Sequence, residues 1–386
     1  MIGLLLIIYI AFISLGLPDS MLGSAWTVMH ADVGAPIALA GIISMVICGG
    51  TIISSLMASR MIRRLGTWRV VTVSVLMTAL ALLGFSVSGA VWMLLLFAVP
   101  LGLGAGAVDA VLNNFVALHY KPRHMNWLHC FWGIGATGGS LVIAAFLGAG
   151  GSWRTGYTAI GILQATLVIG LFLSRRLWRL PENTASAEAA ETGAFISNRK
   201  AAGIRGVKAS LIAFFCYCSL ETGAGLWSAS YLTTRRGVSP ADAALWVSLY
   251  YGGITAGRFL GGLLAEKMKS ESLIRGGLAV IAAGIALLLL PLPPAFCMAG
   301  LILIGLGCAP VYPGMIYLVP ERFGKAASQS VIGLSMACAY VGSTFMPPLI
   351  GALSAVLTLG VLPYMLALFL LGTVVSSEMI NQKAGI

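Results

Sequence analysis

Long apolar runs cover most of this chain, and short polar segments separate them. A helix needs about 20 predominantly apolar residues to cross the hydrocarbon core of a bilayer. By this criterion the pattern predicts twelve membrane-spanning helices. Their expected bounds are 2–28, 37–59, 69–88, 91–118, 124–148, 154–174, 208–233, 240–265, 272–291, 295–319, 326–354 and 358–379. We therefore expect an all-α membrane protein.

The basic residues in the polar segments alternate between the two sides that twelve spans create. One side holds 19 of the 23 lysines and arginines. They are Arg60, Arg63, Arg64, Arg69, Lys121, Arg123, Arg175, Arg176, Arg179, Arg199, Lys200, Arg205, Lys208, Lys267, Lys269, Arg275, Arg322, Lys325 and Lys383. The opposite side holds Arg154, Arg235 and Arg236, and Arg258 lies within a span. Because basic loops stay in the cytoplasm, we predict a multi-pass protein of a bacterial-type plasma membrane with both termini cytoplasmic.

The composition changes this picture little but excludes other classes. The chain has 386 residues, of which 59% are hydrophobic and 9% are charged, and its mean hydropathy is +0.97. Soluble domains carry about 25% charged residues, so a soluble enzyme is excluded. The net charge of +11 reflects the basic loops, and we expect no nucleic-acid partner. The seven cysteines lie in apolar spans without metal-ligand spacing, which favours packing roles and predicts no metal site.

Two halves of six spans follow from the longest polar stretch and from a weak internal repeat. Residues 180–206 are polar and read as a cytoplasmic linker, so we predict bundles at 1–179 and 207–386. Gly102 corresponds to Gly305 and Gly139 to Gly342 at one common offset along the chain. Transporters built from such repeats place their substrate site near the bilayer midplane, between the repeats. The expected architecture is two pseudo-symmetric six-helix bundles.

Two carboxylates in the first half are candidates for proton coupling. Asp19 follows Pro18 in the first span, and Asp109 lies one helical turn before Asn113 in the fourth. A charge at membrane depth costs at least about 2.5–3.5 kcal/mol, so such residues are usually functional. Protonation would remove that cost. The alternatives are that Asp19 caps a helix break at Pro18 and that Asp109 with Asn113 forms an interhelical polar clamp.

The fifth span presents a face suited to a sugar. His129 and Trp132 lie one turn apart, and Asn126 lies one turn earlier, nearer the cytoplasmic end. An indole can pack against the C–H face of a sugar ring, while amide and imidazole groups bond its hydroxyls. Asn113 and Trp26, two turns beyond Asp19, complete the candidate solute contacts of this half. His129 could instead relay protons or satisfy an interhelical hydrogen bond.

In the second half, Glu221 lies at mid-depth in the seventh span. It is a candidate substrate contact, and the alternative is an ion pair with Arg258 of the eighth span. Arg258 lies nearer the cytoplasmic side, and we assign it, with Pro18, a structural or gating role.

Short motifs in both halves resemble the fucose–proton symporter family within the major facilitator superfamily. They are Asp19 in the first span, Gly102-Leu-Gly104 with Asp109 and Asn113 in the fourth, Tyr217, Glu221, Gly225, Tyr231 and Leu232 in the seventh, Tyr312-Pro313 in the tenth, and Pro347-Pro348 with Gly351 in the eleventh. The resemblance implies hexose-type substrates coupled to protons or sodium and adds Tyr312 to the substrate contacts. The chain departs from the family at Asp109, where the family has the longer Glu.

The leading hypothesis is a monomeric secondary transporter that moves a small polar solute, a sugar, by proton-coupled or sodium-coupled symport with alternating access. A proton-driven efflux antiporter for amphiphilic drugs or lipids has the same fold and stays open. A sensor or an intramembrane enzyme is a third class. We expect no enzyme and no resident cofactor, because neither a Ser/His/Asp nucleophile set nor a metal cluster is apparent.

Overall fold

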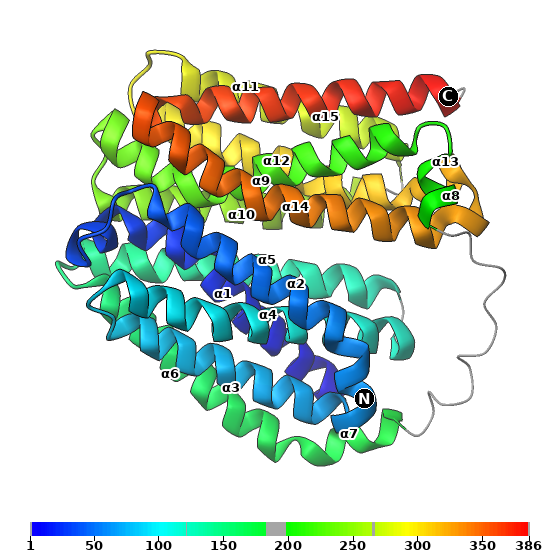
Figure 1. Ribbon diagram of the computed structural model, residues 1–386, viewed down its shortest axis with the longest axis horizontal. Helices are drawn as coiled ribbons and strands as arrows, with labels where there is room; N and C mark the ends of the chain where they lie inside the picture. The colour runs from blue at the N-terminus through cyan, green and yellow to red at the C-terminus, as the bar shows by residue number, and fades with distance from the viewer. Residues whose placement is uncertain (1, 121, 183–197, 265–266, 385–386) are drawn as a thin grey trace. The chain divides into compact units, whose positions relative to one another are not determined.

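The computed structural model describes residues 2–120, 122–182, 198–264 and 267–384, and within them it contains twelve helices of membrane length (Figure 1). They are α1 (Ile2–Asp32), α2 (Leu39–Leu65), α3 (Thr67–Ser86), α4 (Val91–His119), α5 (Pro122–Gly148), α6 (Trp153–Leu173), α9 (Val207–Arg236), α10 (Pro240–Leu264), α11 (Ser270–Leu289), α12 (Ala295–Tyr317), α14 (Lys325–Leu357) and α15 (Leu362–Ala384). Each helix overlaps one expected span, so the predicted all-α, twelve-span fold is confirmed.

Among the described residues, eleven of the twelve helices are long and apolar enough to cross a membrane. Helix α10 carries Arg258 within its span. A charged group at membrane depth is stable only if protein neighbours cover it.

Four short elements connect the long helices. They are α7 (Arg175–Glu182), α8 (Asn198–Ala202), α13 (Val319–Phe323) and the 3-10 turn η1 (Leu359–Val361). Helices α7 and α8 fall at the two ends of the predicted linker 180–206. Residues 183–197 of that linker lie outside the described residues.

The chain divides into two compact units, which we describe separately. The first comprises residues 1–190 and 238–248, and the second comprises residues 191–237 and 249–386. In the first unit α1 packs along α5, α4 packs between α2 and α3, and α3 also packs on α6. In the second unit α9 packs on α14 and α15, and α11 packs on α12.

Close backbone contacts join equivalent helices in each unit. Gly139 of α5 lies against the main-chain carbonyl of Leu17 in α1, so closely that a Cβ atom would overlap that oxygen. Gly342 of α14, its counterpart in the sequence repeat, lies in the same way against the Phe215 carbonyl of α9. Small residues allow such approach where lipid supplies no hydrophobic driving force. The repeat in the sequence therefore corresponds to a repeated packing contact.

Candidate functional site

The first candidate group lies in α1, where Pro18 interrupts the helical hydrogen bonds. Proline has no N–H to donate to the carbonyl four residues earlier, which here belongs to Ser14. The side-chain amide of Gln164 in α6 donates to that carbonyl at 2.7 Å, and Thr78 of α3 donates to the Gln164 amide oxygen at 2.7 Å. All three partners are buried. The network satisfies the carbonyl that Pro18 frees, so α1 continues to Asp32.

Asp19 is the residue after this proline, and its carboxylate contacts the fifth span. The indole N–H of Trp132 in α5 donates to Asp19 Oδ2 at 2.7 Å. The Asp19 side chain is exposed, whereas its neighbours Leu17 and Ser20 are buried. Two residues that sequence reasoning placed in different spans, with different roles, are thus joined by one charge-assisted hydrogen bond.

Asp109 and Asn113 of α4 interact as their spacing predicts. The Asn113 amide nitrogen donates to Asp109 Oδ1 at 2.9 Å and to the Asp109 main-chain oxygen at 2.9 Å. Both of its N–H donors are therefore directed within the helix, and its amide oxygen is left to accept from a ligand hydroxyl. Asp19 and Asp109 lie on α1 and α4, which contact each other within the first unit.

The part of the α1–α5 contact nearest the start of both helices holds residues that sequence reasoning missed. The Tyr9 hydroxyl lies 3.0 Å from His124 Nδ1, and the Tyr9 ring stacks on Phe131 at a centroid distance of 4.5 Å. The predicted contact His129 is exposed and meets the edge of Phe12 at 6.1 Å. Tyr9 and His124 give no sequence signal, because only the packing of two helices pairs them.

Trp26 and Asn126 are the other two predicted solute contacts of this half. Trp26 is fully buried, and its indole N–H donates to the main-chain oxygen of Ile37 at 2.7 Å. This bond ties α1 to the segment that leads into α2. The side chain of Asn126 lies outside the described residues.

In the second unit Glu221 of α9 faces Arg258 of α10. The Arg258 guanidinium lies 3.9 Å from Glu221 Oε1, and the two side chains are 17% and 21% exposed. The Tyr250 hydroxyl donates to the main-chain oxygen of Glu221 at 2.9 Å. This is the ion pair that the sequence left open as an alternative. At 3.9 Å it leaves the carboxylate oxygens able to accept further hydrogen bonds.

Tyr312 of α12 belongs to an aromatic group beside this pair. It meets Phe214 edge-on at 5.5 Å and lies 6.2 Å from Tyr217, and its side chain is half-buried. The Tyr217 hydroxyl donates to the main-chain oxygen of Cys308 at 2.8 Å. Aromatic and polar surfaces therefore meet in this unit as they do at Trp132 in the first.

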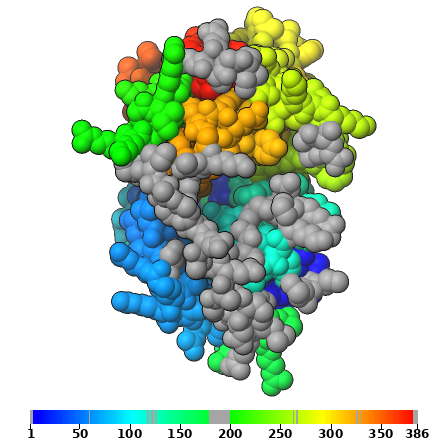
Figure 2. Space-filling model, turned by 90° about the vertical axis from the view of Figure 1, so that its right-hand side faces the viewer, coloured from blue at the N-terminus to red at the C-terminus, as the bar shows by residue number. Residues whose placement is uncertain are grey.

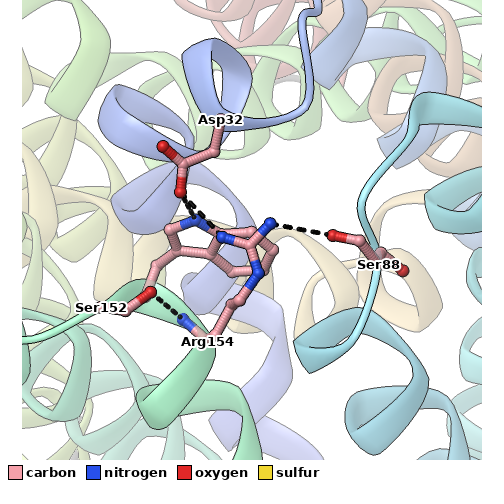
Figure 3. Close-up of polar contacts among 5 residues, drawn as sticks. Asp32, Ser88, Ser152 and Arg154 are labelled. Atoms are coloured by element: carbon pink, nitrogen blue, oxygen red, sulfur yellow. Dashed lines mark hydrogen bonds and ion pairs between the residues drawn. The ribbon is translucent and has the colours of Figure 1, made fainter.

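A polar cluster joins the end of α1, the segment after α3 and the start of α6 (Figure 3). Asp32 Oδ2, at the end of α1, accepts from Trp153 Nε1 and from the Arg154 guanidinium of α6, both at 2.8 Å. Arg154 also donates to the Ser88 carbonyl after α3 at 3.1 Å and lies over the Trp153 ring at 4.3 Å. Arg154 is one of three arginines on the side predicted to be external.

We expect Arg154→Gln to lower the free energy of unfolding by about 1–2 kcal/mol, because it removes a partly exposed ion pair and a charged hydrogen bond to the Ser88 carbonyl. Thermal unfolding of the purified protein in detergent measures the change. Asp32→Asn keeps an acceptor for Trp153 and Arg154 and should cost less. If the two variants lose equal stability, charge pairing alone accounts for the cluster.

Comparison with known proteins places this architecture in a family. A sequence profile described as Major Facilitator Superfamily matches residues 8–347. The chain belongs to this superfamily. It is therefore a multi-pass membrane carrier and not an enzyme, as predicted. The finer resemblance to fucose–proton symporters is not confirmed by these comparisons.

Relatives and solved structures agree with this assignment. The glucose/mannose transporter GlcP of Bacillus subtilis is 25% identical over 306 residues, which are 77% of this chain and 74% of that protein. An uncharacterized MFS-type transporter of Yersinia pestis is 26% identical over 73% of this chain and 71% of its own length. A crystal structure of a D-xylose–proton symporter matches with a TM-score of 0.73 at 14% identity, covering 98% of this chain and 97% of that one. An inward-facing, unoccupied bacterial homolog of the human lysosomal transporter Spinster matches with a TM-score of 0.74 at 11% identity, covering 98% and 96%. At these identities the structures show a shared fold.

Proposed function

We propose that this carrier is a sugar–proton symporter whose coupling residues are Asp19 and Asp109. The observation that carries the proposal is the 2.7 Å hydrogen bond from the Trp132 indole to Asp19. It joins an aromatic surface suited to a sugar ring to an acid suited to a proton. The similarity to a glucose/mannose transporter and the motifs shared with fucose–proton symporters support a sugar as the solute.

Charge pairing distinguishes the acids of the two units. Among the described residues, neither Asp19 nor Asp109 forms an ion pair with a basic side chain, whereas Glu221 faces Arg258. A carboxylate without a cationic partner gains most from binding a proton in a low-dielectric setting. We therefore infer that protons bind in the first unit, whereas Glu221 pairs with Arg258 in the second.

The hydrogen bond to Trp132 links proton and solute. A charged carboxylate accepts a stronger hydrogen bond than a neutral acid does, so protonation of Asp19 loosens its hold on the indole. The indole is then available to pack against the sugar, whose hydroxyls bond the amide oxygen of Asn113 and the ring of His129. Because the neutral acids remove the cost of charge at membrane depth, the loaded carrier changes conformation more easily than the empty, charged one.

Proteoliposomes containing the purified protein test the function directly. A panel of hexoses, pentoses and deoxy sugars is added outside, and external pH is recorded in weakly buffered medium with and without sodium. Symport with protons predicts alkalinisation that depends on one class of sugar and persists without sodium. A response that requires sodium would show that sodium, and not the proton, is the coupling ion. Proton release driven by amphiphilic compounds, with no response to any sugar, would support the efflux alternative and overturn the proposal.

Trp132→Phe separates the two roles of the indole, because it keeps an aromatic ring and removes the N–H donor. Hydrogen bonds to charged groups contribute about 1.5–3 kcal/mol, so Asp19 should protonate more easily and half-maximal uptake should move toward alkaline pH by about one unit or more. Sugar affinity should change little. Trp132→Ala should weaken sugar binding as well. An unchanged pH profile in Trp132→Phe would show that the hydrogen bond has no part in coupling.

A further inference from the structure

Five arginines gather at the end of the first unit where α2 passes into α3 and α6 into α7. We call Arg63, Arg64, Arg69, Arg175 and Arg176 the arginine corner. All five side chains are exposed. Within the part of the chain that the structure describes, none of them forms an ion pair. Figure 2 looks onto this end of the molecule, with the α2–α3 segment in blue at the lower left.

Buried contacts hold the two parts of the arginine corner together. The Trp68 indole at the start of α3 donates to the Leu171 carbonyl of α6 at 2.7 Å. The Arg175 guanidinium lies over the Trp68 ring at 5.2 Å. Trp178 of α7 is 1% exposed and packs in the same apolar cluster as Leu171. The charges of α7 are thus held beside the α2–α3 turn by packing and a cation–π contact.

Exposed apolar side chains lie directly beside these charges. Phe172 and Leu173 at the end of α6 are 62% and 77% exposed, and Leu177 of α7 is 43% exposed. The Phe172 ring lies 6.0 Å from the Trp68 ring that Arg175 covers. A free phosphate or nucleotide would use the charges only. A phospholipid has an anionic headgroup for the arginines and acyl chains for the apolar side chains.

We propose that the arginine corner is a binding site for an anionic phospholipid of the leaflet predicted to be cytoplasmic. Guanidinium groups bind phosphate oxygens bidentately, and basic clusters just outside a membrane span attract anionic lipids. The headgroup lies against Arg175, Arg176 and Arg69, and an acyl chain runs along Phe172 and Leu173. This proposal is independent of the solute and of the coupling ion.

Native mass spectrometry of the full-length protein, titrated in detergent with phosphatidylglycerol or phosphatidylcholine, tests the site. Each basic residue near an anionic surface strengthens binding about five-fold, so Arg175→Gln/Arg176→Gln should weaken phosphatidylglycerol binding about 25-fold. Arg175→Lys/Arg176→Lys keeps the charge but loses the planar guanidinium, so it should bind less tightly than the unchanged protein and more tightly than the glutamine variant. Arg199→Gln/Lys200→Gln in α8 removes two exposed charges elsewhere and is the matched control.

Each outcome decides the proposal. Selective loss of phosphatidylglycerol in Arg175→Gln/Arg176→Gln, with phosphatidylcholine binding unchanged, supports it. Equal losses in that variant and in the α8 control would show general electrostatic attraction and overturn it. Competition by inorganic phosphate at the concentration of the lipid would show an anion site without acyl contacts and would also overturn it. If the glutamine variant does not fold, weaker phosphatidylglycerol binding in Arg69→Gln, with phosphatidylcholine binding unchanged, decides instead.

Discussion

Asp109→Asn is expected to abolish sugar-driven proton movement while leaving sugar binding measurable. Asparagine has the shape of aspartate and still accepts the 2.9 Å hydrogen bond from Asn113, so the α4 backbone and its neighbours need not move. It cannot bind or release a proton at this position. The coupling free energy between two sites is typically about 1–3 kcal/mol, which corresponds to about 5- to 150-fold in affinity. The ratio of sugar affinities at acidic and alkaline pH should fall below this range, and the pH dependence that remains should come from Asp19.

External pH and radiolabelled sugar are recorded together in proteoliposomes to measure this loss. The variant should show no alkalinisation but should still exchange internal for external sugar, because exchange needs no net proton transfer. Asp242→Asn is the matched control: its carboxylate accepts from the Ser239 hydroxyl at the exposed start of α10, so coupling should persist. Normal alkalinisation in Asp109→Asn would remove Asp109 from the mechanism without refuting sugar transport.

Contacts within one helix could be predicted from the sequence, because helical periodicity fixes them. The bond between Asp109 and Asn113 follows from their spacing of four residues. The spans follow from hydropathy, because a bilayer admits few structures. The alternation of basic loops also predicts an orientation for the chain.

Contacts between helices could not be predicted in this way. The bond between Asp19 and Trp132 depends on the rotation of α1 against α5, which no pattern along the chain specifies. Gln164 was missed for the same reason. Pro18 signals that a carbonyl in the preceding turn needs a donor, but not that the donor comes from α6. Trp26 is a third example. Its position two turns beyond Asp19 suggested a solute contact, and nothing along the chain indicated that its indole bonds the main-chain oxygen of Ile37.

Close packing of α1 and α5 is what brings Asp19 to Trp132, and Gly139→Ala is expected to disrupt it. The added methyl group would overlap the main-chain oxygen of Leu17 and stand 2.7 Å from the Ser20 hydroxyl. A side chain could rotate away, but a carbonyl within a helix cannot without losing its hydrogen bond. Overpacking typically costs about 1–3 kcal/mol, and we expect the upper end of that range, with weakened sugar uptake.

Gly138→Ala isolates this effect, because it adds the same methyl group one residue earlier in the same helix. There the nearest atom is the flexible Leu17 Cδ2 at 3.4 Å, an ordinary contact. Alanine is favoured over glycine in a helix by about 1 kcal/mol, so this variant should unfold at the same or a higher temperature. The repeat predicts the same contrast in the second unit. The methyl group of Gly342→Ala would overlap the Phe215 carbonyl, whereas that of Gly333→Ala would meet no neighbouring atom within 4 Å. Equal unfolding temperatures within each pair would show that helix separation adjusts freely, and the α1–α5 contact would then not hold Asp19 at Trp132.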